Sequence, residues 1–346
     1  MKNVTCRIFV VPVSILLSAC GGGGWSTSAP TSPVAIIPSS PVTPVVIPAD
    51  LQTTVPPFYY VTGSPELAFV TALNQLRQQV GLGLLAQSTA LDKSAQNHLG
   101  YVLTNNITTG GTVDMSHIDP GTGRSMFHLE QADKPGFTGL QEFDRAAAVG
   151  YVGTYVGEEV TFGGGKGGQV AFESLVRTVY HRAGLLMEVP RDVGLAVGKD
   201  ASQTVVLEFG YAKAQSNASD FFGVYPSDNQ SGVGRFTGVE TPNPFPDLST
   251  RNDDFPTKTG YPVSVTSKAG SILQVVTFTI TEAGSTTPLE ARLLTKDTDP
   301  NHVLDSNTAY LVARSTLKAN TTYDVVFSGR VDNALMAKTW KFTTGS

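Results

Sequence analysis

The spacing of apolar residues changes along this chain of 346 residues, and the change limits the folds that it can adopt. Apolar positions first recur at helical intervals at Phe69, Leu73, Leu76 and Val80. That period predicts an amphipathic helix with one buried face. Ser64 suits the N-cap, Pro65 suits the first helical position, and Gly81 stops the pattern.

The segments that follow predict a mixed architecture. Helices are expected from about Thr89, over about 140–149 and over 169–180. Strands are expected over 193–197 and 204–209, where apolar residues run together or alternate. Helices followed by a short sheet predict an α+β fold over residues 64–215.

Beyond residue 218 the pattern changes to that of a β protein. Short strand-like runs such as "LQVVTFTIT" and "TYDVVFSG" alternate with turn residues at regular intervals. Such spacing is typical of an antiparallel β-sandwich, so residues 218–346 are expected to form an all-β domain.

The N-terminus predicts an export signal rather than a fold. Lys2 and Arg7 precede an apolar run, and Leu17-Ser18-Ala19-Cys20 resembles the bacterial lipobox. The resemblance implies cleavage after residue 19 and a lipid on Cys20; an ordinary signal with a chance cysteine is the alternative. Residues 20–63, rich in Pro, Ser and Thr, are expected to form an extended stalk.

Charge and composition narrow the location and the partners. The net charge of −5 argues against nucleic-acid binding, which needs a basic surface. No run of eighteen apolar residues follows the N-terminus, so the body is not expected to span a membrane. We therefore expect a lipid-anchored protein of the bacterial cell envelope. No Asp follows Cys20 to favour inner-membrane retention, which points to the outer membrane or cell surface.

Several motifs of the middle segment, taken in order, resemble the CAP superfamily, which includes cysteine-rich secretory and pathogenesis-related proteins. They are "LNQLRQQVGLGLL", "SHID", "PGFTGLQEFDRAAAVGY", "VGEEV", "TVYHRAGLL" and "LEFGY". The resemblance implies an α-β-α sandwich. The C-terminal run "LKANTTYDVVFSGRVDNALMAKTWKFTTG" resembles bacterial Ig-like domains, which implies a spacer or adhesion module.

The CAP resemblance also implies a cleft with two histidines and two glutamates. Its motifs carry over to His117, Glu158 and His181, whereas Thr178 stands where the second glutamate is expected. Glu159 and Glu173 are accessory candidates without motif support. Two imidazoles and a carboxylate suit Zn²⁺ with an open position for water.

Each candidate has a structural alternative. His181 could be a cation at a helix C-terminus, favoured by the helix dipole. His98 falls on an apolar helix face and is expected to be structural, while His128 is expected to be solvated in a loop. Glu158 and Glu159 would form a solvated pair in most proteins. Three further residues are expected to be structural: Arg145, Arg182 and His302.

Two functions follow as hypotheses. The first is a non-catalytic surface module that binds an apolar small molecule, an envelope glycan or a surface protein. The second is a Zn-dependent hydrolase, a protease or a nuclease, that uses His117, Glu158 and His181 to hold or activate water. A purely structural role in the envelope is a third interpretation.

Overall fold

The first long helix forms where the sequence predicts it. In the computed structural model, α1 spans Pro65–Val80, and the Ser64 side chain accepts a hydrogen bond from the Leu67 N–H at 3.2 Å. Gly81 closes the helix with a φ of 88°, a left-handed conformation that glycine adopts without strain. The structure describes residues 47–105, 126–161, 167–199, 203–249 and 254–346, so His117, Cys20 and most of the predicted stalk lie outside it.

The next helices agree with the sequence in two cases and differ in one. α2 spans Thr89–Thr104 and α3 spans Glu142–Ala148, close to their predicted positions. The predicted helix over 169–180 is instead two short helices, α4 over Gly168–Val176 and α5 over Tyr180–Leu185.

The break between α4 and α5 has a local cause. Thr178 donates its hydroxyl to the Leu175 carbonyl at 2.6 Å, which competes with the helical backbone bonds. The N–H groups of Val179 and Tyr180 donate to the Glu240 side chain, at 2.7 and 2.8 Å, instead of continuing α4. The chain therefore turns at residue 178 and begins a new helix.

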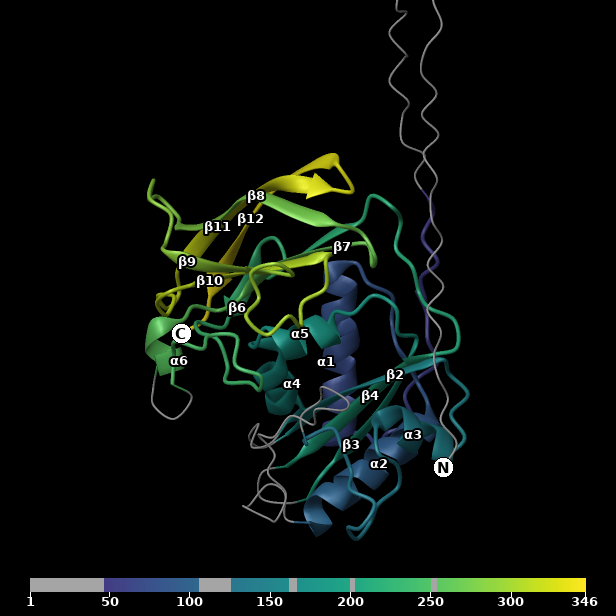
Figure 1. Ribbon diagram of the computed structural model, residues 1–346. Helices are drawn as coiled ribbons and strands as arrows, with labels where there is room; N and C mark the ends of the chain where they lie inside the picture. The colour runs from purple at the N-terminus through teal and green to yellow at the C-terminus, as the bar shows by residue number, and fades with distance from the viewer. Residues whose placement is uncertain (1–46, 106–125, 162–166, 200–202, 250–253) are drawn as a thin grey trace, which may run out of the picture. The chain divides into compact units, whose positions relative to one another are not determined.

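A four-stranded sheet lies between the helices. Its strands, in the order β1-β3-β4-β2, are Ala86–Gln87, Asp192–Val197, Val205–Tyr211 and Tyr155–Thr161. β4 pairs antiparallel with both neighbours, and β1 pairs parallel with β3. Helices α2 and α3 lie on one face of this sheet, and α1, α4 and α5 lie on the other (Figure 1).

The C-terminal part is almost entirely β, as predicted. One sheet has the order β5-β7-β10-β9, with strands Phe222–Tyr225, Val263–Ser267, Thr308–Ala313 and Ala291–Thr295. The other has the order β6-β12-β11-β8, with strands Gln230–Val233, Ala334–Thr344, Thr322–Val331 and Leu273–Glu282. A short helix, α6, spans Asp254–Lys258. The fold is thus mixed α+β.

The apolar core is continuous between the two parts. One cluster of buried side chains contains Phe69 of α1, Val263 of β7 and Phe342 of β12. Residues 46–346 accordingly form one compact unit. No helix of the described segments is long and apolar enough to cross a membrane.

Candidate functional site

Strand β2 carries the two adjacent glutamates to opposite faces of the first sheet. Side chains alternate along a strand, so Glu158 and Glu159 point away from each other. Glu158 points toward α2 and α3, where it contacts His98 and Arg145. Glu159 points toward α5, where its carboxyl lies near His181. The two neighbours therefore belong to different clusters.

The first cluster surrounds the Glu158 carboxylate, whose side chain is fully buried. One oxygen accepts from Arg145 at 2.5 Å, and the other lies 3.0 Å from His128 Nδ1 and 3.6 Å from His98 Nε2. Burial opposes the charge of Glu158, but Arg145 and the two histidines hold its pKa well below the usual range. Glu158 is therefore an ionised, paired group.

Glu208 faces Glu158 across the β2–β4 ladder, and its pKa is shifted in the opposite direction. Burial, and then the charge of Glu158, raise the pKa of Glu208 well above its ordinary value. One of its oxygens accepts from Ser94 at 2.9 Å, and the other has no hydrogen-bond partner among the described residues. The raised pKa of Glu208 favours its protonated form, which reduces the repulsion between the two carboxyls at this ladder position.

The histidines of this cluster bear on two predictions. His98 is fully buried, with Nδ1 3.0 Å from Glu130 and Nε2 2.9 Å from the Phe127 carbonyl, as expected of a structural histidine. The prediction that His128 is solvated is wrong, because its side chain is only 25 % exposed and pairs with Glu158. The interpretation of Glu158 and Glu159 as a solvated pair is also wrong, since their side chains are 0 % and 13 % exposed.

The second cluster is built around His181. Its Nδ1 lies 3.1 Å from Glu240 Oε2 and 3.3 Å from Thr178 Oγ1, and its Nε2 lies 3.9 Å from Glu159 Oε2. The alternative of a C-terminal helix cation is wrong, because His181 is the second residue of α5. A cation near the N-terminus of a helix is disfavoured by the helix dipole, and the negative charge of the buried Glu240 carboxylate offsets this unfavourable interaction.

Glu240 ties the C-terminal part of the chain to this histidine. Its two oxygens accept from the N–H groups of Val179, Tyr180 and His181, at 2.7, 2.8 and 3.2 Å. Nothing in the sequence near residue 240 marks it as a site residue. Only the packing of residues 234–241 against α4 and α5 brings it there, as the 2.9 Å bond from the Gly238 N–H to the Arg177 carbonyl shows.

The protonation of this cluster differs from that of free side chains. Burial, together with the nearby Glu240 and Glu158, raises the pKa of Glu159 to about 8 despite the opposing charge of His181. Burial disfavours charge on His181 too, but the Glu240 hydrogen bond and the Glu159 carboxyl raise its pKa above the ordinary value. At neutral pH Glu159 therefore keeps its proton, and the charged form of His181 persists to higher pH than that of a free imidazole.

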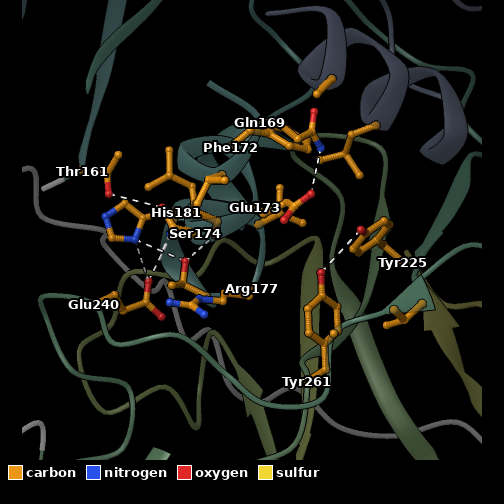
Figure 2. A pocket seen from close by; sticks show the side chains of 18 of the residues that line it. Thr161, Gln169, Phe172, Glu173, Ser174, Arg177, His181, Tyr225, Glu240 and Tyr261 are labelled. Carbon is orange, nitrogen blue, oxygen red and sulfur yellow. Dashed lines mark hydrogen bonds and ion pairs between the residues drawn. The ribbon is translucent and has the colours of Figure 1, made fainter. Parts of the chain in front are cut away.

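Both His128 and His181 line one cavity of about 890 Å³. Figure 2 shows His181 beside Glu240 in its lining. Its walls come from α1, α4, α5 and β2 on one side, and from β5, β6 and residues 234–241 on the other. The polar side chains of the lining include Gln75, Gln79, Gln169, Glu173, Arg177, Gln230, Arg235 and Glu240. The aromatic ones are Phe127, Phe172, Tyr225, Phe236 and Tyr261. We call this cavity the interlobe cleft.

The structure separates the predicted site residues. Glu159 rather than Glu158 lies beside His181, and Glu173 is an exposed residue of the cleft whose carboxylate accepts from Gln169 at 2.9 Å. Among the described residues, no three His, Cys, Asp or Glu side chains are placed to hold a metal ion. Glu158 is a poor fit as a Zn²⁺ ligand because Arg145 and His128 already take both of its oxygens. His117 lies outside the described residues.

Comparison with known proteins gives limited structural similarity. No protein family matches the sequence, and no curated protein does. An extracellular protein containing an SCP domain from Bacillus anthracis is similar over 42 % of this chain and 39 % of its own, at 19 % identity and a TM-score of 0.31. An outer surface protein from Borrelia burgdorferi is similar over 44 % of this chain and 97 % of its own, at 15 % identity and a TM-score of 0.32. The chain thus spans about two fifths of the first protein and nearly all of the second.

Proposed function

We propose that this protein is a lipid-anchored surface module that binds an envelope glycan in the interlobe cleft. In this proposal residues 64–215 form a CAP-type α-β-α sandwich, and residues 218–346 form an Ig-like domain that supplies one wall of the cleft. The observation that carries the proposal is the cleft itself, at about 890 Å³, with polar and aromatic side chains from both parts of the chain. That volume is typical of a small-molecule site.

The chemistry of the walls favours a glycan over an apolar molecule. Gln75 and Gln79 are exposed one turn apart on α1, and Gln169 lies on the neighbouring α4. Each primary amide offers donors and an acceptor, which match the paired donor and acceptor character of sugar hydroxyls. The partly exposed ring of Phe236 offers a flat apolar surface for the C–H face of a sugar ring.

The Zn-dependent hydrolase is the weaker candidate. The pairing of Glu158 with Arg145 leaves that carboxylate without a free oxygen for a metal. Glu240 is a second carboxylate beside His181, but its oxygens bind backbone N–H groups and His181. Both carboxylates are thus engaged in protein contacts, which favours a binding role.

Glycan binding can be tested with purified full-length protein in detergent. Isothermal titration with N,N′-diacetylchitobiose and with the N-acetylglucosamine–N-acetylmuramic acid disaccharide should give saturable heats. Gln75→Ala and Gln169→Ala should weaken both ligands. The surface variant Glu282→Gln, on β8, is the control and should bind as the wild type does. No saturable heat with either sugar would contradict the proposal.

The anchor needs a separate test, since Cys20 lies outside the described residues. Cells that express the protein should incorporate labelled palmitate into it, and Cys20→Ala should abolish the label. Surface proteolysis of intact cells would then distinguish outward display from a periplasmic location. A Cys20→Ala protein that still carried the lipid label would contradict lipidation at Cys20.

A further inference from the structure

The gap between His181 and Glu159 is suited to a ligand oxygen. The Nε2 and Oε2 atoms lie 3.9 Å apart, too far for a direct hydrogen bond. Their side chains are 16 % and 13 % exposed, and His181 lines the interlobe cleft. Glu159 has no hydrogen-bond partner among the described residues, and its Oε1 lies so close to Gly184 that a Cβ there would come within 1.8 Å. An oxygen between the two groups would satisfy both.

Both groups are prepared to donate rather than to accept. Glu240 accepts the Nδ1 proton of His181 and favours the imidazolium, so Nε2–H remains as a donor toward the gap. The protonated Glu159 carboxyl adds an O–H donor. A ligand atom that accepts two hydrogen bonds beside a positive charge is best supplied by a carboxylate.

The surrounding charges also favour an anion. Arg177 is exposed in the cleft, where its guanidinium stacks over Phe236 at 5.7 Å, and no carboxylate of the described residues pairs with it. Arg235 lines the same cleft and donates Nε–H to the Leu317 carbonyl. The opposing charges are the exposed Glu173 and the buried Glu240, against which stand Arg177, Arg235 and His181.

We propose that the interlobe cleft binds an acidic glycan through its carboxylate, which takes hydrogen bonds from His181 and Glu159 while Arg177 contributes charge. This inference rests on the proposed function, and it narrows the ligand to a carboxylate-bearing sugar. Glu240 acts as a positioning residue, because it orients the imidazole and sets its protonation without touching the ligand. The C-terminal part of the chain thus forms one wall of the interlobe cleft and, through Glu240, also determines the class of ligand.

Two disaccharides that differ by one group provide the test. N-acetylglucosamine–N-acetylmuramic acid carries a lactyl carboxylate that N,N′-diacetylchitobiose lacks. At pH 6 the acidic sugar should bind the full-length protein at least about tenfold more tightly, the size expected of a charge-assisted hydrogen bond. The preference should fall as pH rises from 6 to 9, because Glu159 ionises near pH 8 and adds a negative charge beside Glu240 and Glu158, which Arg177 and His181 only partly offset.

Variants separate the inference from the proposed function. Glu240→Gln and Arg177→Gln should each reduce the ratio of the two affinities, acidic sugar over chitobiose, severalfold. Arg177 is exposed, so that variant tests the charge even if Glu240→Gln fails to fold. Equal affinity of the wild type for the two sugars would overturn the carboxylate site and leave glycan binding intact. No binding of either sugar would overturn both.

Discussion

His181 Nδ1 lies 3.1 Å from Oε2 of Glu240, a residue 59 positions further along the chain. The same carboxylate accepts hydrogen bonds from the first N–H groups at the start of α5. One side chain therefore both separates α5 from α4 and orients the imidazole. A histidine on the helical part of the chain is therefore held by the β part. The relationship makes the two parts interdependent in stability and in any chemistry at the cleft.

Removal of the Glu240 carboxylate should destabilise the protein. Glu240→Ala leaves the N–H groups of Val179 and Tyr180 buried without their partner, and the loss should be about 2 kcal/mol. Urea denaturation followed by circular dichroism measures it. Glu290→Ala removes an exposed carboxylate, paired with Arg314 at 3.4 Å, and should cost little. Equal losses in both variants would contradict the capping role.

The free energy of unfolding should fall as pH rises from about 5 to 8. Glu159 ionises near 4.5 when unfolded but has a pKa of about 8 in the fold, so the native state holds an extra proton in that interval. His181, whose pKa is also raised, changes stability in the same direction. Glu159→Gln should flatten this slope in urea denaturation at several pH values. A wild-type stability that rose over this range would contradict the assignment.

Below pH 4.5 the trend should reverse because of the first cluster. The pKa of Glu158 is lowered in the fold, so its contribution is present above its unfolded pKa and is lost as pH falls. Arg145→Met should leave Glu158 and Glu130 buried without this cation and cost about 3–5 kcal/mol. The double variant Arg145→Met, Glu158→Gln should recover part of that loss. If the double variant were less stable than Arg145→Met, the pair would not be the cause.

Two glycine variants distinguish a change in the surroundings of Glu159 from a general effect on helix stability. Gly184→Ala places a Cβ 1.8 Å from Glu159 Oε1, so the carboxyl must move and the pKa of Glu159 should fall. Gly100→Ala, within α2, meets no atom within 4 Å and should stabilise the protein by about 0.5–1 kcal/mol. NMR titration of labelled Glu side chains reports the first effect, and thermal unfolding reports the second. An unchanged Glu159 pKa in Gly184→Ala would contradict the close packing.

Local features of the fold could be predicted well from the sequence. Ser64 and Gly81 mark the ends of α1 because capping and left-handed turns depend on neighbouring residues alone. The strands β3 and β4 also lie where apolar runs predict them. The break after Val176 was missed, because its main cause is a carboxylate far away in sequence.

The candidate site could be predicted only in part. His181 lines the interlobe cleft, and the alternation of side chains along a strand is a sufficient signal that Glu158 and Glu159 face apart. The pairing of His128 with Glu158 was missed because the loop that carries His128 has no periodic pattern. No short-range signal could have indicated Glu240.

The sequence by itself determined the order of helical and β segments, the positions of the caps and the presence of His181 near a helix end. Apolar periodicity and capping depend on residues that are close in sequence, so they can be recognised from the sequence alone. Tertiary structure alone decided which carboxylates reach which histidines, and which of them keep their protons. Those outcomes depend on burial and on charges brought within a few ångströms by the packing of distant segments, as Glu240 is brought to His181.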